Sequence, residues 1–417
     1  MKRTRKAVAR TVLGSTTGLA VVMGGCGSGA AQEMIQPILT LPTQEAATRM
    51  LENESRNGMF KLAMFDIYPR ASGSVYYDDN IDINSVDSRE DVVWTFSPGL
   101  SAVALGGGSG EEPKSLQLDY SPSFLFYTHH SSENTVNQWG RVAGVWPFAK
   151  LTLGFNQTVR TSTGPVIDVG GRTEQLLLGT ALTSRYAVGE KTSVEINGEL
   201  NISDYSDGSY TSAWDWSNQD WFNYQVGAKL SVGVGLVLGY IDLKDAPDQN
   251  YEDILVRAVY ALAEKVSVTA SVGADWRQYR SGVNNALNPV WNVGATYQPW
   301  DTTALSLGLY QRYRSSALYG DQDYLSTGVN LSLRQQLLKK LSLSLAGSYY
   351  HASYEAIQMG VVADRRDDVF EARTSLDFQI QDRWSASLFY AFGSDQSNLD
   401  QFTFNRNQVG LQTTWVF

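Results

Sequence analysis

Cysteine, histidine and long apolar runs are scarce in this 417-residue chain, and each shortage narrows what the protein can be. Its single cysteine, Cys26, permits neither an intrachain disulfide nor a zinc site built from thiolates. The only histidines are His129, His130 and His351, which leaves few catalytic arrangements of imidazoles. Beyond the amino-terminal region, no stretch approaches the roughly 18 uncharged apolar residues that a membrane helix needs.

The amino-terminal region has basic residues and no acids, followed by a weakly apolar run over 7–22 and then small residues ending at Ala31. This order is typical of a secretory signal peptide, and we predict residues 1–31 as that segment. In a rival interpretation, 23–26 loosely resembles a lipobox and Cys26 is acylated. Both interpretations predict that the chain leaves the cytoplasm.

Acidic residues outnumber basic ones, and the excess grows once the predicted signal is removed. The chain has 33 Lys and Arg against 43 Asp and Glu. Five basic residues and no acid lie in 1–31, so 28 basic and 43 acidic residues remain, a net charge of about −15. Nucleic acids and anionic membrane surfaces attract lysine and arginine, so this balance predicts no nucleic-acid partner.

Most of the chain repeats one unit: a strand of about 12 to 15 residues, a tight turn, a second strand and a longer acidic loop. A glycine-rich turn near Gly233 to Gly235 is expected to fill the one doubled gap between successive turns. This regular hairpin period predicts an up-and-down meander. The tight turns are predicted at 147–150, 188–191, 263–265, 298–301, 338–340 and 381–383.

Apolar and polar residues alternate inside the predicted strands. In the segment 266–277, Val268, Val272 and Trp276 share one face, and Asp275 and Arg277 share the other. Strands of a soluble sandwich also alternate, but they average about 5 or 6 residues, whereas these are long enough to cross a bilayer when tilted. Tryptophans at strand ends are expected to form an interfacial girdle; they are Trp94, Trp139, Trp146, Trp276, Trp291, Trp300 and Trp384.

The sequence therefore predicts an all-β fold, a transmembrane antiparallel up-and-down β-barrel of about 18 strands over 66–417. Its expected location is the bacterial outer membrane, with outer-membrane lipid around it and both termini in the periplasm. Residues 32–65 are predicted as a periplasmic amino-terminal segment or a plug.

The end of the chain alternates in the same way and finishes on an aromatic residue. Leu411, Trp415 and Phe417 share an apolar face, while Gln408 and Gln412 lie on the other. Such an end resembles the terminal strand of bacterial outer-membrane barrels, which the barrel assembly machinery reads. We interpret Leu411, Trp415 and Phe417 as an assembly signal with its apolar face toward lipid.

Three short segments near the start of the predicted barrel carry a family resemblance. Phe65-Asp66-Ile67-Tyr68-Pro69-Arg70 is followed by Tyr76-Tyr77-Asp78-Asp79-Asn80-Ile81 and then by Phe96-Ser97-Pro98-Gly99-Leu100. This pattern resembles the β-barrel porin 2 family of outer-membrane proteins. The resemblance implies a large barrel, and it implies an association with polysaccharide export, since some members accompany exopolysaccharide export systems.

Charged residues on the polar face of the strands are expected to line the lumen, because a barrel of about 18 strands encloses water. Mixed charges on the wall would create a transverse field that orients polar solutes. Alternatively, they form ion pairs that close or merely solvate the lumen. The candidate pore-lining residues are Glu195, Glu199, Asp275, Arg277, Arg312, Arg314, Arg334, Glu371, Arg373 and Asp377.

A predicted loop over 204–221 combines five aromatic residues with several aspartates. Flat aromatic faces beside carboxylates suit sugar rings, which offer apolar C–H faces and hydroxyl donors. The alternative is a loop that packs on itself over the rim of the barrel. The candidate sugar contacts are Tyr205, Tyr210, Trp214, Trp216 and Trp221.

Two further patterns are weighed and set aside. Acidic and amide residues alternate over 78–84 as in a calcium loop, but Ile83 and Arg89 replace the glycine and glutamate that an EF-hand requires, so no metal site is predicted. Ser131, Ser132 and Glu133 follow the histidine pair, yet a solvated loop explains them as well as a serine triad does. No glycine-rich phosphate loop opens a helix, and neither an enzyme nor a cofactor is predicted.

Together these features predict a porin-like channel for small hydrophilic or saccharide solutes, including an exported polysaccharide. Two alternatives stay open: an outer-membrane hydrolase acting on lipid or an envelope substrate, and a structural or adhesive barrel with a blocked lumen. A homo-oligomer also stays open.

Overall fold

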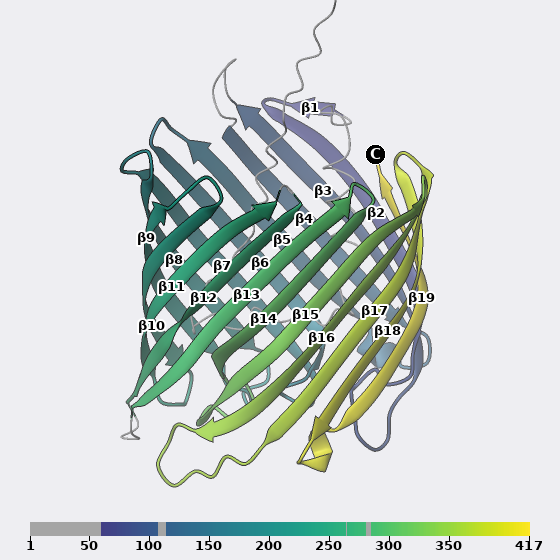
Figure 1. Cartoon of the computed structure of the whole chain (residues 1–417). Helices are drawn as coiled ribbons and strands as arrows, with labels where there is room; N and C mark the ends of the chain where they lie inside the picture. The colour runs from purple at the N-terminus through teal and green to yellow at the C-terminus, as the bar shows by residue number, and fades with distance from the viewer. Residues whose placement is uncertain (1–59, 107–113, 264, 281–284) are drawn as a thin grey trace, which may run out of the picture.

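The computed structural model describes residues 60–106, 114–263, 265–280 and 285–417, which form one antiparallel sheet (Figure 1). The predicted signal peptide and most of the predicted segment 32–65 lie outside the described residues. Two short 3₁₀ turns, η1 (Ser131–Glu133) and η2 (Asp400–Phe402), accompany the strands. The strands are β1 (Phe60–Leu62), β2 (Phe65–Asp78), β3 (Asp91–Gly106), β4 (Lys114–Tyr127), β5 (Thr135–Pro147), β6 (Leu151–Val166), β7 (Gly171–Ala187), β8 (Thr192–Tyr205), β9 (Ala213–Gln225), β10 (Leu230–Leu243), β11 (Gln249–Ala263), β12 (Val266–Tyr279), β13 (Ala286–Trp300), β14 (Thr303–Ser315), β15 (Gln322–Leu338), β16 (Leu341–Ala356), β17 (Arg366–Gln381), β18 (Trp384–Ser397) and β19 (Phe404–Val416).

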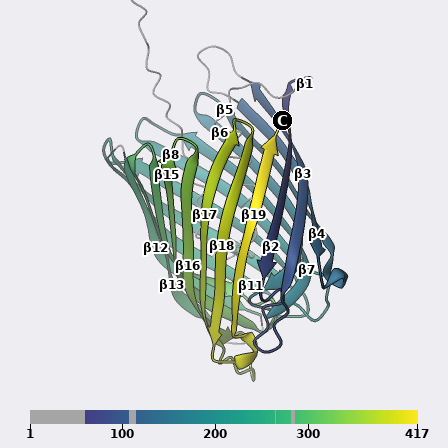
Figure 2. The same ribbon diagram turned by 90° about the vertical axis from the view of Figure 1, so that its right-hand side faces the viewer.

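The sheet closes on itself. Each strand from β2 to β18 pairs with the next in sequence, and β19 returns to pair antiparallel with β2, from Gln408↔Asp78 to Val416↔Arg70 (Figure 2). Closure removes the bare strand edges that lipid could not satisfy with hydrogen bonds. The predicted all-β, up-and-down barrel of 18 strands is confirmed, with β1 as a short addition that pairs with the start of β2.

Short turns join the strands at one end of the barrel, and most of the longer connections lie at the other. We call these the turn end, at the top of Figure 1 beside the carboxy-terminus, and the loop end, at its bottom. Residues 188–191 are a connection at the turn end, and 79–90 and 357–365 are connections at the loop end. The glycine-rich connection between β3 and β4 lies outside the described residues. No helix in the described part of the chain is long and apolar enough to cross a membrane.

The predicted turn near Gly233 to Gly235 is wrong, because β10 runs through both glycines. The turn between β9 and β10 lies at 226–229 instead. A side chain at Gly235 would lie 2.7 Å from the Trp221 ring on the neighbouring strand, and one at Gly233 would lie 2.5 Å from Asn223. These glycines therefore make room on the wall and do not bend the chain.

The two faces of the wall have opposite polarity. On β12, Val272 and Trp276 are 58% and 44% exposed, while the alternate residues Asp275 and Arg277 are fully buried. The outer face is therefore apolar and the inner face polar, as in barrels that lie in lipid. The prediction that Trp139 belongs to the interfacial girdle is wrong. Trp139 lies on the inner face, where the Arg70 guanidinium is 5.9 Å from its ring.

The carboxy-terminal strand has the faces that the sequence predicts. Leu411 and Trp415 are exposed on the outer face, whereas Gln408 and Gln412 are buried on the inner face. The Trp415 ring stacks on Trp384 and on Phe417, with centroids 6.0 Å and 5.4 Å apart. The amide of Phe417 donates a 2.9 Å hydrogen bond to the carbonyl of Pro69, so the last residue also ties the end of β19 to β2.

We expect deletion of Phe417 to lower the folded fraction of the protein in the outer membrane severalfold. The deletion removes a stacked ring and a hydrogen bond from the closing strand pair. The measurement is the fraction that migrates as the folded species on an unheated detergent gel. Val362→Ser, in an exposed loop, is the control, and an unchanged folded fraction on deletion would show that Phe417 takes no part in assembly.

Candidate functional site: the lumen and its loop-end cap

The ten charged residues predicted to line the pore all fall on the inner face by strand register. Their role in transport stays a prediction. They come from five strands: Glu195 and Glu199 on β8, Asp275 and Arg277 on β12, Arg312 and Arg314 on β14, Arg334 on β15, and Glu371, Arg373 and Asp377 on β17.

Many of these charges contact partners on the same wall. Arg257 of β11 donates to Glu195 at 2.8 Å, and its guanidinium lies 4.1 Å from the Trp221 ring. Asp377 accepts hydrogen bonds from the hydroxyls of Ser344 and Ser387 at 2.9 Å and 2.7 Å. A paired charge produces a weaker field across the lumen than a free one, so Glu195 fits the ion-pair alternative, whereas the partners of Asp377 are neutral hydroxyls.

Arg277 is the centre of a buried cluster that joins distant strands. Its guanidinium is 3.2 Å from Asp275 and 3.1 Å from Asp323 of β15, and it donates to Gln249 at 2.9 Å. Pairing between β13 and β14 stops at Trp291↔Gln311. The ends of β14 and β15 are therefore free to leave the wall, which brings Asp323 to Arg277.

A second hairpin, β6–β7, also leaves the wall at the loop end. Backbone pairing between β5 and β6 stops at Gln138↔Thr161. Thr163 bonds β5 only through the side chains of Asn137 and Thr135, so the tip beyond Thr163 continues without a paired strand on that side. The amide of Ala317, between β14 and β15, donates to Asp168 at the tip of β6–β7 at 2.6 Å. These hairpins lie eight strands apart in a ring of 18, so their tips can meet only by crossing the lumen.

Asp168 collects hydrogen bonds from several segments at this crossing. Its carboxylate accepts from the hydroxyl of Ser316 at 3.1 Å and from that of Tyr354 at 2.7 Å. Arg365, between β16 and β17, donates to the backbone carbonyl of Asp168 at 2.7 Å and lies 3.8 Å from its carboxylate. We call the contacting segments 166–170, 205–211, 316–321 and 354–365, with Phe402, the loop-end cap.

Arg365 is held on all sides within the cap. It forms an ion pair with Asp367 at 2.7 Å, and its guanidinium lies 3.5 Å from the Phe402 ring. Burial alone would lower the pKa of Arg365, but Tyr354, Asp168 and Asp367 outweigh burial and raise this pKa above its usual range. The guanidinium therefore stays charged in the cap.

Apolar contacts fill the rest of the cap. Val166, Val169, Tyr205 and Ala317 are buried together, and Tyr210 packs against them. Only glycine suits position 170, because φ is +72° there and a side chain would lie 2.6 Å from the Phe402 ring. The cap therefore has a packed core of its own.

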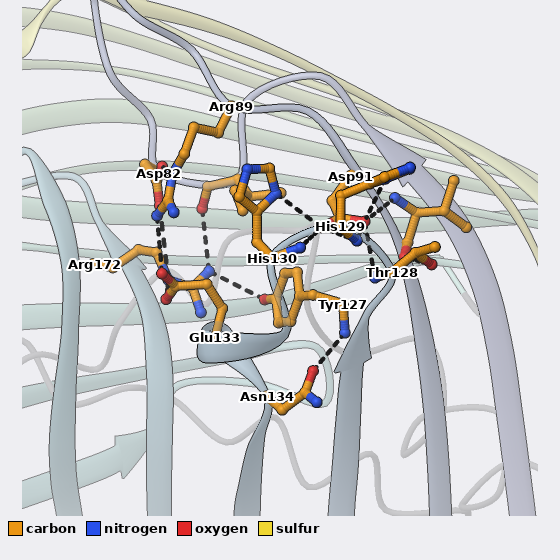
Figure 3. A network of polar contacts seen from close by, with 12 residues as sticks. Asp82, Arg89, Asp91, Tyr127, Thr128, His129, His130, Glu133, Asn134 and Arg172 are labelled. Carbon is orange, nitrogen blue, oxygen red and sulfur yellow. Dashed lines mark hydrogen bonds and ion pairs between the residues drawn. The ribbon is translucent and has the colours of Figure 1, made fainter.

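The first loop joins the inner wall through a network of ion pairs (Figure 3). Arg89 bonds Asp82 and donates to Glu133 at 3.0 Å, and Arg172 of β7 is 3.2 Å from Glu133. Asp78 pairs with Arg406 of β19. Arginines thus meet the carboxylates of the calcium-like pattern, and in the described part of the chain no group of three or more His, Cys, Asp or Glu could hold a metal ion.

The histidine pair is bound to a buried carboxylate. Nδ1 of His130 lies 2.9 Å from Asp91, and the amides of Thr128 and His130 donate to the same carboxylate at 2.9 Å and 2.8 Å (Figure 3). Glu133 points instead to the arginines. These contacts anchor the β4–β5 loop to the start of β3.

The five predicted sugar contacts do not form one surface, and most of their predicted loop is strand. β8 ends at Tyr205 and β9 begins at Ala213. Trp214 and Trp216 are exposed on the outer face, whereas Trp221 is buried on the inner face. The cause is the alternation of an extended strand, which places odd and even positions of β9 on opposite sides. Tyr205 and Tyr210 belong to the cap.

Nothing in the sequence marks Asp168 or Arg365 as site residues. Asp168 bonds residues 148 to 197 positions away along the chain, and no local pattern marks such partners.

Several solved structures align with most of this chain. OccAB3 of Acinetobacter baumannii aligns at 12% identity and a TM-score of 0.44, covering 84% of this chain and 99% of its own. OpdK of Pseudomonas aeruginosa, solved with vanillate, aligns at 14% identity and a TM-score of 0.41, covering 84% of this chain and 99% of its own. The FrpB iron transporter of Neisseria meningitidis aligns at 9% identity and a TM-score of 0.45, covering 84% of this chain and 64% of its own.

At these identities and TM-scores the likeness carries no argument about function. No family model matches the chain, and no curated protein matches it. The resemblance to the β-barrel porin 2 family therefore stays a prediction.

We expect Asp168→Ala to loosen the cap and raise solute flux through the barrel severalfold. Each buried hydrogen bond to a charged group contributes about 1.5–3 kcal/mol, and Asp168 accepts several. The measurement is the swelling rate of proteoliposomes in a neutral sugar. Asp87→Ala removes the same charge from an exposed position at the same end and is the control. Equal rates for wild type and Asp168→Ala would contradict a restrictive cap.

Proposed function

We propose that this chain forms a porin-like channel for hydrophilic solutes in the bacterial outer membrane. The observation that carries the proposal is a closed barrel with inverted polarity, apolar outside and charged inside. An apolar outer face requires lipid, and a polar inner face lets water and polar solutes enter the barrel.

The proposal includes an orientation. In outer-membrane barrels the short turns lie on the periplasmic side and the longer loops outside. The turn end holds the start of β2 and the end of β19, so the first strand begins and the last strand ends on the periplasmic side in this orientation. Phe417 then lies where the barrel assembly machinery would bind it.

The loop-end cap gives the proposed channel its narrow part. Solutes have to pass the cap, whose centre holds the buried, paired charges of Asp168 and Arg365 beside apolar side chains. The proposal includes no catalytic step, since the contacts of His129 and His130 with Asp91 serve to anchor a loop. Oligosaccharide or an exported polysaccharide as the solute rests on the family resemblance, because the aromatic residues expected to bind sugar do not gather.

We expect the purified, folded protein to give discrete single-channel currents in planar lipid bilayers. The steps should be larger for Asp168→Ala than for wild type, because that substitution removes the centre of the cap. Absence of current in both proteins would contradict the channel and favour the blocked barrel. Release of fatty acid from lipid that is lost in His130→Ala would favour the hydrolase instead.

A further inference from the structure

The outer face of the barrel is apolar at mid-height around most of its circumference. Residues five to seven positions from the turn end of each strand lie at similar height. On β10, β12, β14, β15 and β19 these outward residues are Leu236, Val272, Leu309, Leu331 and Leu411. This is the surface expected for contact with lipid chains.

Four adjacent strands, β6 to β9, depart from this pattern at the same height. Most of the outward residues there are polar or small: Gln157 on β6, Thr180 on β7, Gly198 on β8, and Asn218 and Asp220 on β9, with Leu182 on β7 as the apolar exception. Register places them on the outer face. Asp220 pairs with Ile196 and Leu236, which are 54% and 42% exposed, and it alternates with the buried Trp221.

The aromatic residues of β9 fix the depth of Asn218 and Asp220. Trp214 and Trp216 are exposed toward the loop end, and Phe222 and Tyr224 are exposed toward the turn end. Outward aromatics mark the two boundaries of the lipid layer in barrels of this kind. Asn218 and Asp220 therefore lie between the boundaries, where lipid offers no hydrogen-bond partner.

The chain does not satisfy Asp220 itself. Neither carboxylate oxygen has a hydrogen-bond partner among the described residues: Oδ1 is covered by neighbouring atoms, whereas Oδ2 is not covered and can be reached from outside the chain. A polar group in this position is costly in lipid, so it requires a polar partner from outside the chain.

The same patch holds a matching donor. The Thr180 hydroxyl donates to Oε1 of Gln157 at 2.7 Å, while the Gln157 amide nitrogen has only a long, 3.4 Å contact with Thr158. Donor capacity therefore lies on β6 and β7, and an acceptor lies on β9 at similar height. Between them, a side chain at Gly198 would meet nothing within 4 Å, so another surface can approach the backbone closely.

We propose that the outer face of β6–β9 binds a second copy of this chain, an inference that rests on the proposed membrane location. A two-fold axis parallel to the barrel axis, passing between β7 and β8, exchanges the two halves of the patch. Gln157 of each copy then faces Asp220 of the other, and both amide–carboxyl contacts form away from lipid. Gly198 lies beside the axis.

The first experiment measures the mass of the wild-type protein in mild detergent by light scattering. We expect twice the chain mass for wild type and the single mass for Asp220→Leu and Gln157→Leu. Leu309→Asn, on the outer face of β14, is the matched control and should keep the double mass. Folding is checked on unheated gels, and Asp220→Leu should fold normally because leucine suits a lipid-facing position. A single mass for wild type would overturn the proposal, and three copies would overturn the two-fold arrangement.

The second experiment tests the contact in the native membrane. Cys26, the only cysteine of the sequence, lies in the predicted signal peptide or is acylated, so an introduced cysteine would supply the one free thiol of the mature chain. We expect Gly198→Cys to form a disulfide-linked dimer under mild oxidation and Leu309→Cys to form none. Equal crosslinking of the two variants would overturn the proposal. If the wild-type protein has the mass of one chain but gives normal channel currents, the interface alone is rejected. If the folded wild-type protein gives no current, the proposed channel is rejected.

Discussion

The hydrogen bonds between β19 and β2 are the interaction on which the rest of the structure depends. Backbone groups have no partner in lipid, so a sheet can lie there only if its first and last strands meet. Once the ring is closed, each side chain of a strand points either outward or inward. The apolar outer face and the polar inner face then follow from the alternation of apolar and polar residues. Closure also sets the start of β2 and the end of β19 at one end of the barrel, leaving the other end to the longer loops.

The loop-end cap arises where that regular pairing stops. β6 extends beyond the last residue that pairs with β5, and β14 extends beyond the last residue that pairs with β13. Two hairpin tips therefore have no paired strand on one side. Freed from the wall, they cross the lumen and meet at Asp168, and Arg365 joins them from a third connection. The wall therefore depends on an alternating pattern repeated along every strand, whereas the cap depends on a few buried charged residues.

The alternation of apolar and polar residues was enough to predict the strands, their two faces and the closed barrel, because each strand shows this alternation on its own. It failed at Gly233 and Gly235, whose lack of a side chain relieves crowding by Trp221 and Asn223 and does not turn the chain. It also failed on β9, where aspartates among aromatic residues were interpreted as a loop, although Trp214 and Trp216 already stood at even spacing. The cap could not be predicted, since Asp168 and its partners are joined only by the completed ring.

The bond from the Phe417 amide to Pro69 carries a consequence for the timing of folding. The strands it helps to join are separated by more than 300 residues, as the 328-residue separation of Asp78 and Arg406 shows. Contacts between such distant parts of a chain form slowly, because a long loop has to close before they contribute any stability. The ring therefore cannot be sealed while the chain is still being synthesised, and a truncated product retains an open edge. Sealing of the ring is therefore a late step of folding, which can follow but never precede the synthesis of β19.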